Sequence, residues 1–553
     1  MNPELSKIQS SNIALSPLIT KALKKKPAKP LGERKKAVRR QELMVLLGNA
    51  CVVSSGMSVS LPSVSLPQLT SPDDIYQLNT EEISWFASIN SMACPIGGLI
   101  VGYLMDRFGR KNTMLLTNVV GLIGWVLLVT APYQSARHAI FLQLLLGRFI
   151  SGLMMGAVLS PIGSYSAEIS LPRIRGRLIL GTSIAIATGI LTMYVLGLII
   201  RNQFQMVCII SAIYQCVAFC CILPMPESPS WLLQKGYAEK ARKSLKYFRG
   251  LSENDNTTYD EFENELALIK KTSDQSRADA ANESLLQVIR AREVYKPLIM
   301  MIGFFFFQQF SGIVIIIVFA AQIATSAGVS ADPMLVAVFV GIARIVTTFF
   351  MSTIFERWGR RPAGMLSAAG MTVCMFLLAA NGWWPVIGES FALLPIICIV
   401  LHIIFSTLGL LTLPFLMISE VFPQRVRGSA NGVTLFVGLT FSFSVVKLYP
   451  TIESLIGTPN SFFGFGFISL LGLVFIIFVV PETKGRTLLE IENYFRTGRR
   501  VTNAQVARRQ SQIVMEVAQG VYSSQFELDE VIMRLSKVHE DCEANENELI
   551  SAK

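Results

Sequence analysis

The sequence predicts an all-α membrane protein with twelve transmembrane helices in two six-helix bundles and cytoplasmic helices between the halves. Three observations predict this fold. Hydrophobic residues make up 52% of the 553 residues and charged residues only 16%, well below the roughly 25% charged residues of soluble domains. Twelve apolar runs have lengths close to the about 20 residues that a helix needs to cross a bilayer. Short charged motifs of the first half also return in the second half.

The apolar runs fall into two sets of six, one before and one after a long polar segment. They cover residues 43–65, 83–105, 112–131, 139–164, 178–200, 204–224, 297–322, 334–355, 363–384, 392–418, 431–450 and 461–480. The first run follows a long basic stretch and no cleavage site follows it. We therefore interpret it as a membrane span and not as a signal peptide.

This pattern divides the chain into five parts. They are a basic N-terminal tail (1–41), a first bundle (42–225), a helical linker (226–296), a second bundle (297–482) and a C-terminal tail (483–553). Connections on one side are rich in Arg and Lys, whereas connections on the other side, such as residues 67–82 and 325–333, contain acids and no Lys or Arg. This asymmetry predicts that both termini and the linker are cytoplasmic. The net charge of +11 follows from it, so we expect the lipid bilayer and no nucleic acid as a partner.

Three motifs occur once in each half. "DRFGRK" at Asp106 returns as "ERWGRR" at Glu356, and "AEISLPRIRG" returns as "SEVFPQRVRG". "PESPSW" at Glu227 returns as "PETKGR" at Glu482. All three returns lie about 250 residues after the first copy, which indicates two related halves. Glycine in the first motif permits a sharp turn between two spans.

Together with "GRFISG" and "QQFSG", these motifs resemble those of the sugar porter family of the major facilitator superfamily. The resemblance runs from about residue 43 to 490, and is strongest to the insect facilitated trehalose transporters. It implies a substrate site near the middle of the bilayer and transport by rocking of one bundle against the other. It also favours the plasma membrane as the location.

The resemblance also implies a gating network of charged residues at the cytoplasmic side. We expect its acids and arginines to pair across the two bundles when that side is closed. The alternative is that they only set topology and anchor helix ends. The candidates are Asp106, Arg107, Arg110, Arg148, Glu168, Arg175, Glu227, Glu356, Arg357, Arg360, Glu420, Arg427 and Glu482.

The expected sugar site departs from the family pattern. Gln308 and Gln309 stand where the family has two sugar-binding glutamines, and an amide can both donate to and accept from a hydroxyl. Ser183, Phe415 and Arg344 stand where the family commonly has Gln, Trp and Asn. A bond between helices is the alternative role for the glutamines. For Arg344 the alternatives are a structural contact or a solute with oxygen acceptors, because an arginine at this depth needs a partner.

We therefore expect facilitated diffusion of a sugar, trehalose or a hexose. The first span carries no acid at the depth where proton-coupled members have one. One alternative is a porter of the same fold for another small solute, for example an anionic one. Another is a nutrient sensor that does not transport and signals through its C-terminal tail, for which we expect a cytosolic partner. No motif for enzymatic chemistry, a cofactor or a metal is found.

Overall fold

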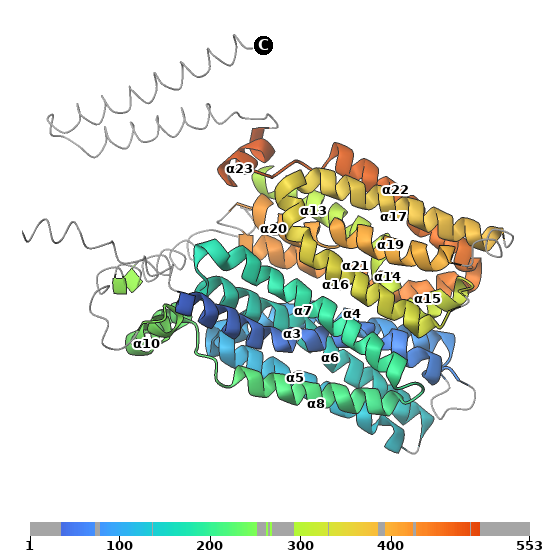
Figure 1. Ribbon diagram of the computed structural model, residues 1–553, viewed down its shortest axis with the longest axis horizontal. Coiled ribbons are helices and arrows are strands. Elements are labelled where there is room, and N and C mark those ends of the chain that lie inside the picture. The colour runs from blue at the N-terminus through green and yellow to red at the C-terminus, as the bar shows by residue number, and fades with distance from the viewer. Residues whose placement is uncertain are drawn as a thin grey trace, which may run out of the picture. The chain divides into compact units, whose positions relative to one another are not determined.

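The computed structural model describes residues 35–71, 78–134, 136–251, 262–263, 266–267, 292–329, 331–384, 393–423, 427–486 and 488–497. All regular structure in these residues is helical, and eleven of the helical segments are long and apolar enough to cross a membrane (Figure 1). The N-terminal tail before Lys35, most of the linker after Leu251 and the tail after Thr497 lie outside the described residues. The expected C-terminal docking segment lies there too.

The first half contributes six long helices. They are α3 (Lys35–Leu69), α4 (Thr80–Phe108), α5 (Arg110–Thr130), α6 (Arg137–Ile169), α7 (Pro172–Ile199) and α8 (Phe204–Ile222). Each contains one of the first six apolar runs. Close packing of α3 on α7 depends on two glycines, since a Cβ on Gly56 or Gly189 would meet a backbone oxygen of the other helix within 2.2 Å.

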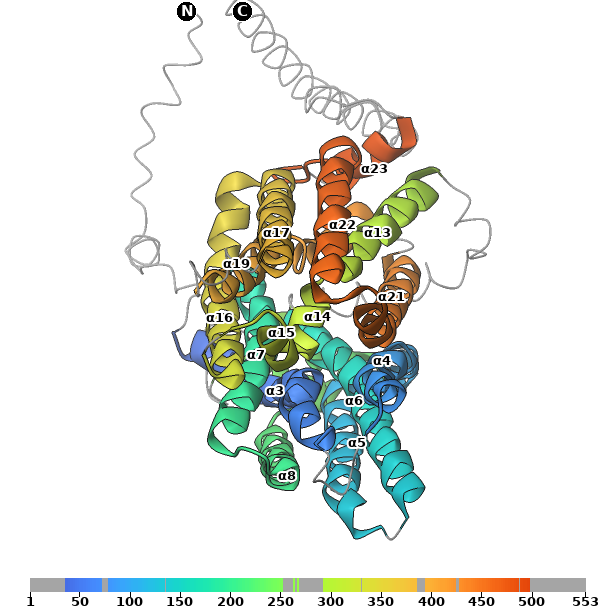
Figure 2. The ribbon, with the colours of Figure 1, turned by 90° about the vertical axis from the view of Figure 1, so that its right-hand side faces the viewer.

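The second half contains α16 (Pro333–Trp358), α17 (Arg360–Trp383), α21 (Arg427–Ile456) and α22 (Thr458–Phe478) as uninterrupted helices. Helix α17 packs against α22 and α19, and α21 packs against α13 (Figure 2). Two other apolar runs are broken. The run 392–418 becomes α19 (Leu394–Leu408) and α20 (Leu413–Val421), separated by Gly409.

The run 297–322 is broken twice, which is why eleven and not twelve apolar segments qualify as spans. It forms α13 (Arg292–Phe310), α14 (Ile313–Val318) and α15 (Ala320–Ser326). The first break is at Gly312, whose φ of 88° is readily adopted by glycine. The second is at Phe319, where φ and ψ of −119° and 29° interrupt the helix.

The chain folds into two compact units. Unit 1 comprises residues 1–58, 96–192 and 205–278, and unit 2 comprises residues 59–95, 193–204 and 279–553. Unit 2 therefore contains the last part of α3, the first part of α4 and the α7–α8 connection together with all helices of the second half.

Short helices lie outside the spans. In unit 1, α9 (Pro229–Gln234) and α10 (Ala238–Phe248) follow α8. Helix α10 is amphipathic, since Ala241, Leu245 and Phe248 are buried and its lysines are exposed or half-buried. In unit 2, α23 (Leu488–Thr497) follows α22.

Candidate functional site

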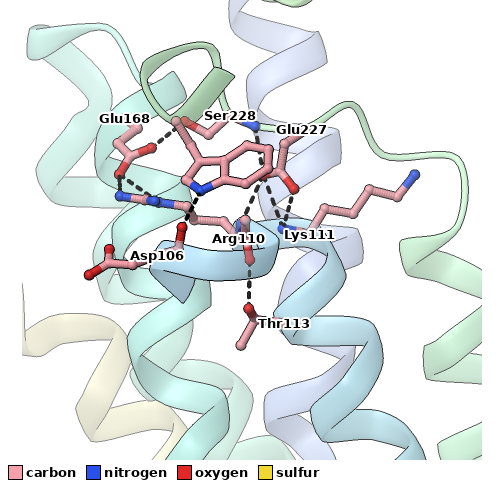
Figure 3. Close-up of polar contacts among 9 residues, drawn as sticks. Asp106, Arg110, Lys111, Thr113, Glu168, Glu227 and Ser228 are labelled. Carbon is pink, nitrogen blue, oxygen red and sulfur yellow. Dashed lines mark hydrogen bonds and ion pairs between the residues drawn. The ribbon is translucent and has the colours of Figure 1, made fainter. Parts of the chain in front are cut away.

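In unit 1, the turn between α4 and α5 is fastened by one carboxylate. Gly109 makes this turn with φ of 93°, a conformation that strains any residue with a Cβ. Glu227, which follows α8, accepts the backbone N–H groups of Arg110 and Lys111 at 3.0 and 3.1 Å (Figure 3). These N–H groups have no partner within α5, so Glu227 caps the helix from a distant part of the chain.

A second carboxylate joins the same turn to α6. The Arg110 guanidinium binds Glu168 with Nε and Nη2 at 2.9 and 2.7 Å. The hydroxyl of Ser228 donates to the other oxygen of Glu168, and the indole of Trp231 donates to the Asp106 carbonyl at 3.1 Å (Figure 3). The ends of α4, α5, α6 and α8 are thereby connected in one network.

Unit 2 contains the same arrangement at the equivalent residues. Gly359 makes the turn with φ of 93°, and Glu482 accepts the N–H groups of Arg360 and Arg361 at 3.0 and 2.9 Å. Arg360 Nη2 binds Glu420 at 2.8 Å, and the hydroxyl of Thr483 donates to Glu420 at 2.5 Å. The repeat in the sequence is therefore a repeat of one hydrogen-bonding pattern.

The two described ion pairs of these networks each join residues of one half. Arg110 pairs with Glu168, and Arg360 pairs with Glu420. The physical reason is that each arginine also belongs to the helix turn that the capping glutamate of its own half fixes.

The two capping glutamates differ in acidity. Burial raises the pKa of Glu227, and this effect exceeds the opposing one of three backbone N–H groups and Arg110. Burial also acts to raise the pKa of Glu482, but the N–H groups of Lys484, Arg360 and Arg361 and the charge of Arg360 outweigh it. The pKa of Glu482 is therefore lowered. The equivalent surroundings thus favour ionisation more strongly in the second half.

Arg148 is not part of this network, contrary to the prediction. It lies on α6 twenty residues before Glu168, or about 30 Å away along the helix. Its buried Nη1 donates to the Ser58 carbonyl of α3 at 2.5 Å. Pro62 has no N–H, so it cannot supply the usual helical donor to this carbonyl four residues earlier. Arg148 satisfies it instead.

The remaining predicted members are peripheral or undescribed. Asp106, Arg107 and Arg175 are exposed, and Arg107 donates to Tyr103. The carbonyl of Arg357 accepts from Lys484 at 2.7 Å. The side chains of Glu356 and Arg427 lie outside the described residues.

Several members of the network were not predicted from the sequence. Ser228 and Thr483 bind the glutamates through their hydroxyls, and Lys111 and Arg361 contribute backbone N–H groups. The signal for the hydroxyls was present in "PES" and "PET", where a Ser or Thr follows the capping acid. Backbone donors leave no such signal.

The predicted sugar-binding glutamines lie at the breaks of two helices in unit 2. Gln308, at the end of α13, donates to the Leu411 carbonyl between α19 and α20 at 2.7 Å, and Gln309 donates to Gln308 Oε1 at 3.1 Å. Both side chains are buried, and Gln309 Oε1 has no hydrogen-bond partner among the described residues. This amide chain links the two broken helices and keeps one acceptor unused.

The break at Phe319 is held by two side chains from the first half of the chain. In a continuous helix the Ala321 N–H would donate to the Ile317 carbonyl. Instead, Ser63 of α3 accepts the Ala321 N–H at 3.0 Å, and the Tyr194 hydroxyl of α7 donates to the Ile317 carbonyl at 2.6 Å. All four residues are buried and belong to unit 2. Two buried hydroxyls thus replace one helical bond.

The other candidate substrate contacts are placed separately. Arg344 lies in the middle of α16, half-buried. Phe415 of α20 is 46% exposed and packs edge-on against Phe305, with ring centroids 5.3 Å apart. Ser183 is half-buried on α7 and belongs to unit 1. Of the five candidates, the structure joins only Gln308 and Gln309 by a hydrogen bond.

A surface ion pair links the α7–α8 connection to the start of α16. Arg201 binds Asp332, whose other oxygen accepts the Met334 N–H at 3.0 Å. Gln68, at the end of α3, accepts the Phe204 N–H at 2.6 Å. Among the described residues there is no group of three or more His, Cys, Asp or Glu side chains placed to hold a metal ion.

Comparison with known proteins gives one consistent family. The profile described as "Sugar (and other) transporter" matches residues 44–495. A facilitated trehalose transporter of Apis mellifera ligustica is 29% identical over 85% of the chain and 92% of its own length. A facilitated trehalose transporter of Polypedilum vanderplanki is 30% identical over 81% of this chain and 86% of its own length. One from Drosophila grimshawi is 31% identical, and the chain spans about half of it, 47%.

Solved structures show the same fold. The xylose transporter XylE of E. coli in its inward open conformation is matched with a TM-score of 0.68 and 20% identity, over 81% of this chain and 98% of that one. Its partially occluded inward open conformation is matched with a TM-score of 0.67 and 19% identity, over 81% and 100%.

Proposed function

Because the chain belongs to the sugar transporter family and has the major facilitator fold, we propose that it carries a sugar across a membrane by alternating access. It is a multi-pass membrane protein whose relatives are transporters and not enzymes. The expected solutes are trehalose and hexoses, since the relatives are facilitated trehalose transporters. Plasma-membrane location, cytoplasmic termini and a cytosolic partner for the tail belong to the same proposal.

One observation carries the proposal beyond family membership, namely the broken helix that holds Gln308 and Gln309. Transporters of this kind bind substrate near the membrane midplane where helices are discontinuous. Here α13 ends and α20 begins at breaks beside the two glutamines, and Gln309 Oε1 is an unused buried acceptor. A sugar hydroxyl can donate to this oxygen, and this would repay the cost of burying it. Ser183 and Phe415 are the other proposed contacts.

The proposed gate consists of the two glutamate networks. Each one fixes the end of a helix bundle as a rigid unit, which suits rocking of whole bundles. Breaking Arg110–Glu168 or Arg360–Glu420 would loosen one bundle end. We expect a change in transport rate with little change in substrate affinity, because no residue of these networks belongs to the proposed sugar site.

The proposed mode is facilitated diffusion. Within α3, the only acid is Glu42, the eighth residue of the helix, and Arg148 donates to the Ser58 carbonyl. No carboxylate is therefore present on the middle of α3 to take up a proton beside Arg148. Transport should follow the sugar gradient alone.

Uptake into liposomes that contain the purified full-length protein tests this function. We expect labelled trehalose or glucose to equilibrate across the membrane faster than in protein-free liposomes, and a protonophore to leave the rate unchanged. Gln309→Leu should raise the KM about tenfold or more, because it removes a hydrogen bond to the solute. Uptake of no solute would contradict transport and favour a sensor. Accumulation driven by outside acid would contradict facilitated diffusion.

A further inference from the structure

Arg344 is the one candidate contact that carries a charge. It is the twelfth of the 26 residues of α16, so it lies near the middle of a membrane span. Its Nη1 is buried and has no hydrogen-bond partner among the described residues. The residue as a whole is half-buried.

No carboxylate of the described spans is placed to neutralise Arg344. In the described spans of unit 2 the acids lie near helix ends, for example at Glu81, Glu293, Asp332, Glu420 and Glu453. A charged side chain at the centre of a bilayer costs at least about 2.5 kcal/mol and usually has a partner. Because the described part of the chain supplies neither a nearby acid nor an acceptor for Nη1, the partner is expected to come from outside the protein.

Two neutral hydrogen-bonding side chains lie on α7 and α15, one of them already engaged and one unused. Tyr194 of α7 lies within electrostatic reach of the guanidinium, and its hydroxyl hydrogen is engaged by the Ile317 carbonyl. Helix α15, which packs against α16, carries Gln322. Both amide atoms of Gln322 are buried and have no partner among the described residues. The helix that packs against the span of Arg344 thus carries a neutral amide that can bind hydroxyls.

We propose that Arg344 makes this porter selective for a monoanionic sugar, an aldonate or uronate whose carboxylate pairs with the guanidinium. This inference rests on the proposed transport function and names its substrate class. The guanidinium presents parallel N–H groups that match the two oxygens of a carboxylate. On the neighbouring α15, Gln322 has amide groups that can bind a sugar hydroxyl.

The charge balance favours a carboxylate over a phosphate ester. Arg344 is the single cation in the middle of the described spans of unit 2, since Lys447 lies late in α21 with its ammonium 4.2 Å from the ring centroid of Trp85. One positive charge neutralises one carboxylate. A phosphate ester carries about −1.5 to −2 at neutral pH and would leave negative charge unpaired in a site of low dielectric, which is costly.

The test uses the full-length protein in liposomes, with labelled glucuronate and labelled glucose. We expect saturable glucuronate uptake by the unmodified protein. Because the carried solute has one negative charge, an inside-positive potential of about 60 mV should produce tenfold accumulation. Arg344→Asn should lower kcat/KM for glucuronate about 100-fold while glucose uptake persists or rises and does not respond to potential.

Two further variants separate charge from geometry and from misfolding. Arg344→Lys keeps the charge but loses the two-pronged contact, so we expect an intermediate loss of about tenfold. Arg292→Asn removes the same charge at the exposed start of α13 and should leave glucuronate uptake unchanged. Glucose uptake by Arg344→Asn shows that this variant is folded. If Arg344→Asn transports neither solute, the proposal is tested by whether glucuronate inhibits glucose uptake by the unmodified protein.

The outcomes distinguish the two proposals. Glucose transport without glucuronate transport or competition overturns the role of Arg344 and leaves the transport function standing. Transport of a sugar phosphate but not of glucuronate overturns the assignment of the substrate class. No transport of any of these solutes by the unmodified protein contradicts the proposed function itself.

Discussion

Removal of the two hydroxyls at Phe319 should have a non-additive effect on stability. Tyr194→Phe leaves the Ile317 carbonyl without its donor, and Ser63→Ala leaves the Ala321 N–H without its acceptor. Ile317 is 3% exposed and Ala321 2%, so water cannot replace the lost partners. An unsatisfied buried polar group costs about 1–3 kcal/mol, and this is the expected loss in each single variant.

The double variant should cost less than the sum of the two. Once both hydroxyls are absent, the freed N–H and carbonyl are four residues apart in one chain and can form the missing helical bond. The expected recovery is about one hydrogen bond, roughly 0.5–1.5 kcal/mol. Such a coupling energy is measured by a double-mutant cycle.

The assay is reversible unfolding of the purified full-length protein in mixed micelles, with helix content as the signal. Tyr214→Phe is the matched control, since Tyr214 donates to the Ala50 carbonyl at 3.0 Å inside the uninterrupted part of α3. That carbonyl keeps its helical donor, so the loss of the hydroxyl should cost less. Additive single costs, or an equal cost for Tyr214→Phe and Tyr194→Phe, would refute the reasoning.

Three further predictions concern the networks and the surface. Gly109→Ala and Gly359→Ala should each destabilise the protein by about 1–3 kcal/mol, because φ is positive at both positions. In addition, the new Cβ would lie 2.4 Å from the Glu227 carboxylate at position 109 and 2.7 Å from the Glu482 carboxylate at position 359. Unchanged free energies of unfolding would contradict this. On acidification Glu227 should protonate before Glu482, since the pKa of Glu227 is raised and that of Glu482 is lowered. The charged form of Glu482 therefore stabilises the fold at neutral pH, and this stabilisation is lost as the pH falls through the folded-state pKa of Glu482. Glu227 behaves in the opposite way: its ionisation destabilises the fold as the pH rises to the folded-state pKa of Glu227. The first carboxyl band in infrared titration should thus disappear in Glu227→Gln and persist in Glu482→Gln. Arg201→Gln should change the unfolding energy by less than about 1 kcal/mol, because the Arg201 side chain is 62% exposed; a larger loss in the same unfolding assay would show that this pair is a structural latch.

The fold could be predicted well from the sequence because membrane spans are read from length and apolarity alone. Each of the twelve runs corresponds to helical structure, and α3 begins earlier than its run only because the helix continues into the basic residues from Lys35. The breaks at Phe319 and Gly409 could not be predicted, because they depend on partners from distant helices. Ser63 and Tyr194 have no local pattern that associates them with α15.

The candidate site was predictable where it repeats. Glu227 and Glu482, with the glycine turns they cap, followed from the duplicated motifs. Arg148 could not be placed from the sequence, because a motif conveys the order of residues but not their depth, and its partner on α3 lies 90 residues earlier in the chain. The opposite pKa shifts of the two glutamates depend on burial and so required the structure.

The capping of α5 and α17 by Glu227 and Glu482 has a consequence for biogenesis. Glu227 is synthesised 117 residues after Arg110, and Glu482 is synthesised 122 residues after Arg360. Neither helix start receives its cap until the last span of its own half has been made. Each half is thus completed by a residue at its end, and a nascent chain that stops inside a half leaves this turn without its cap.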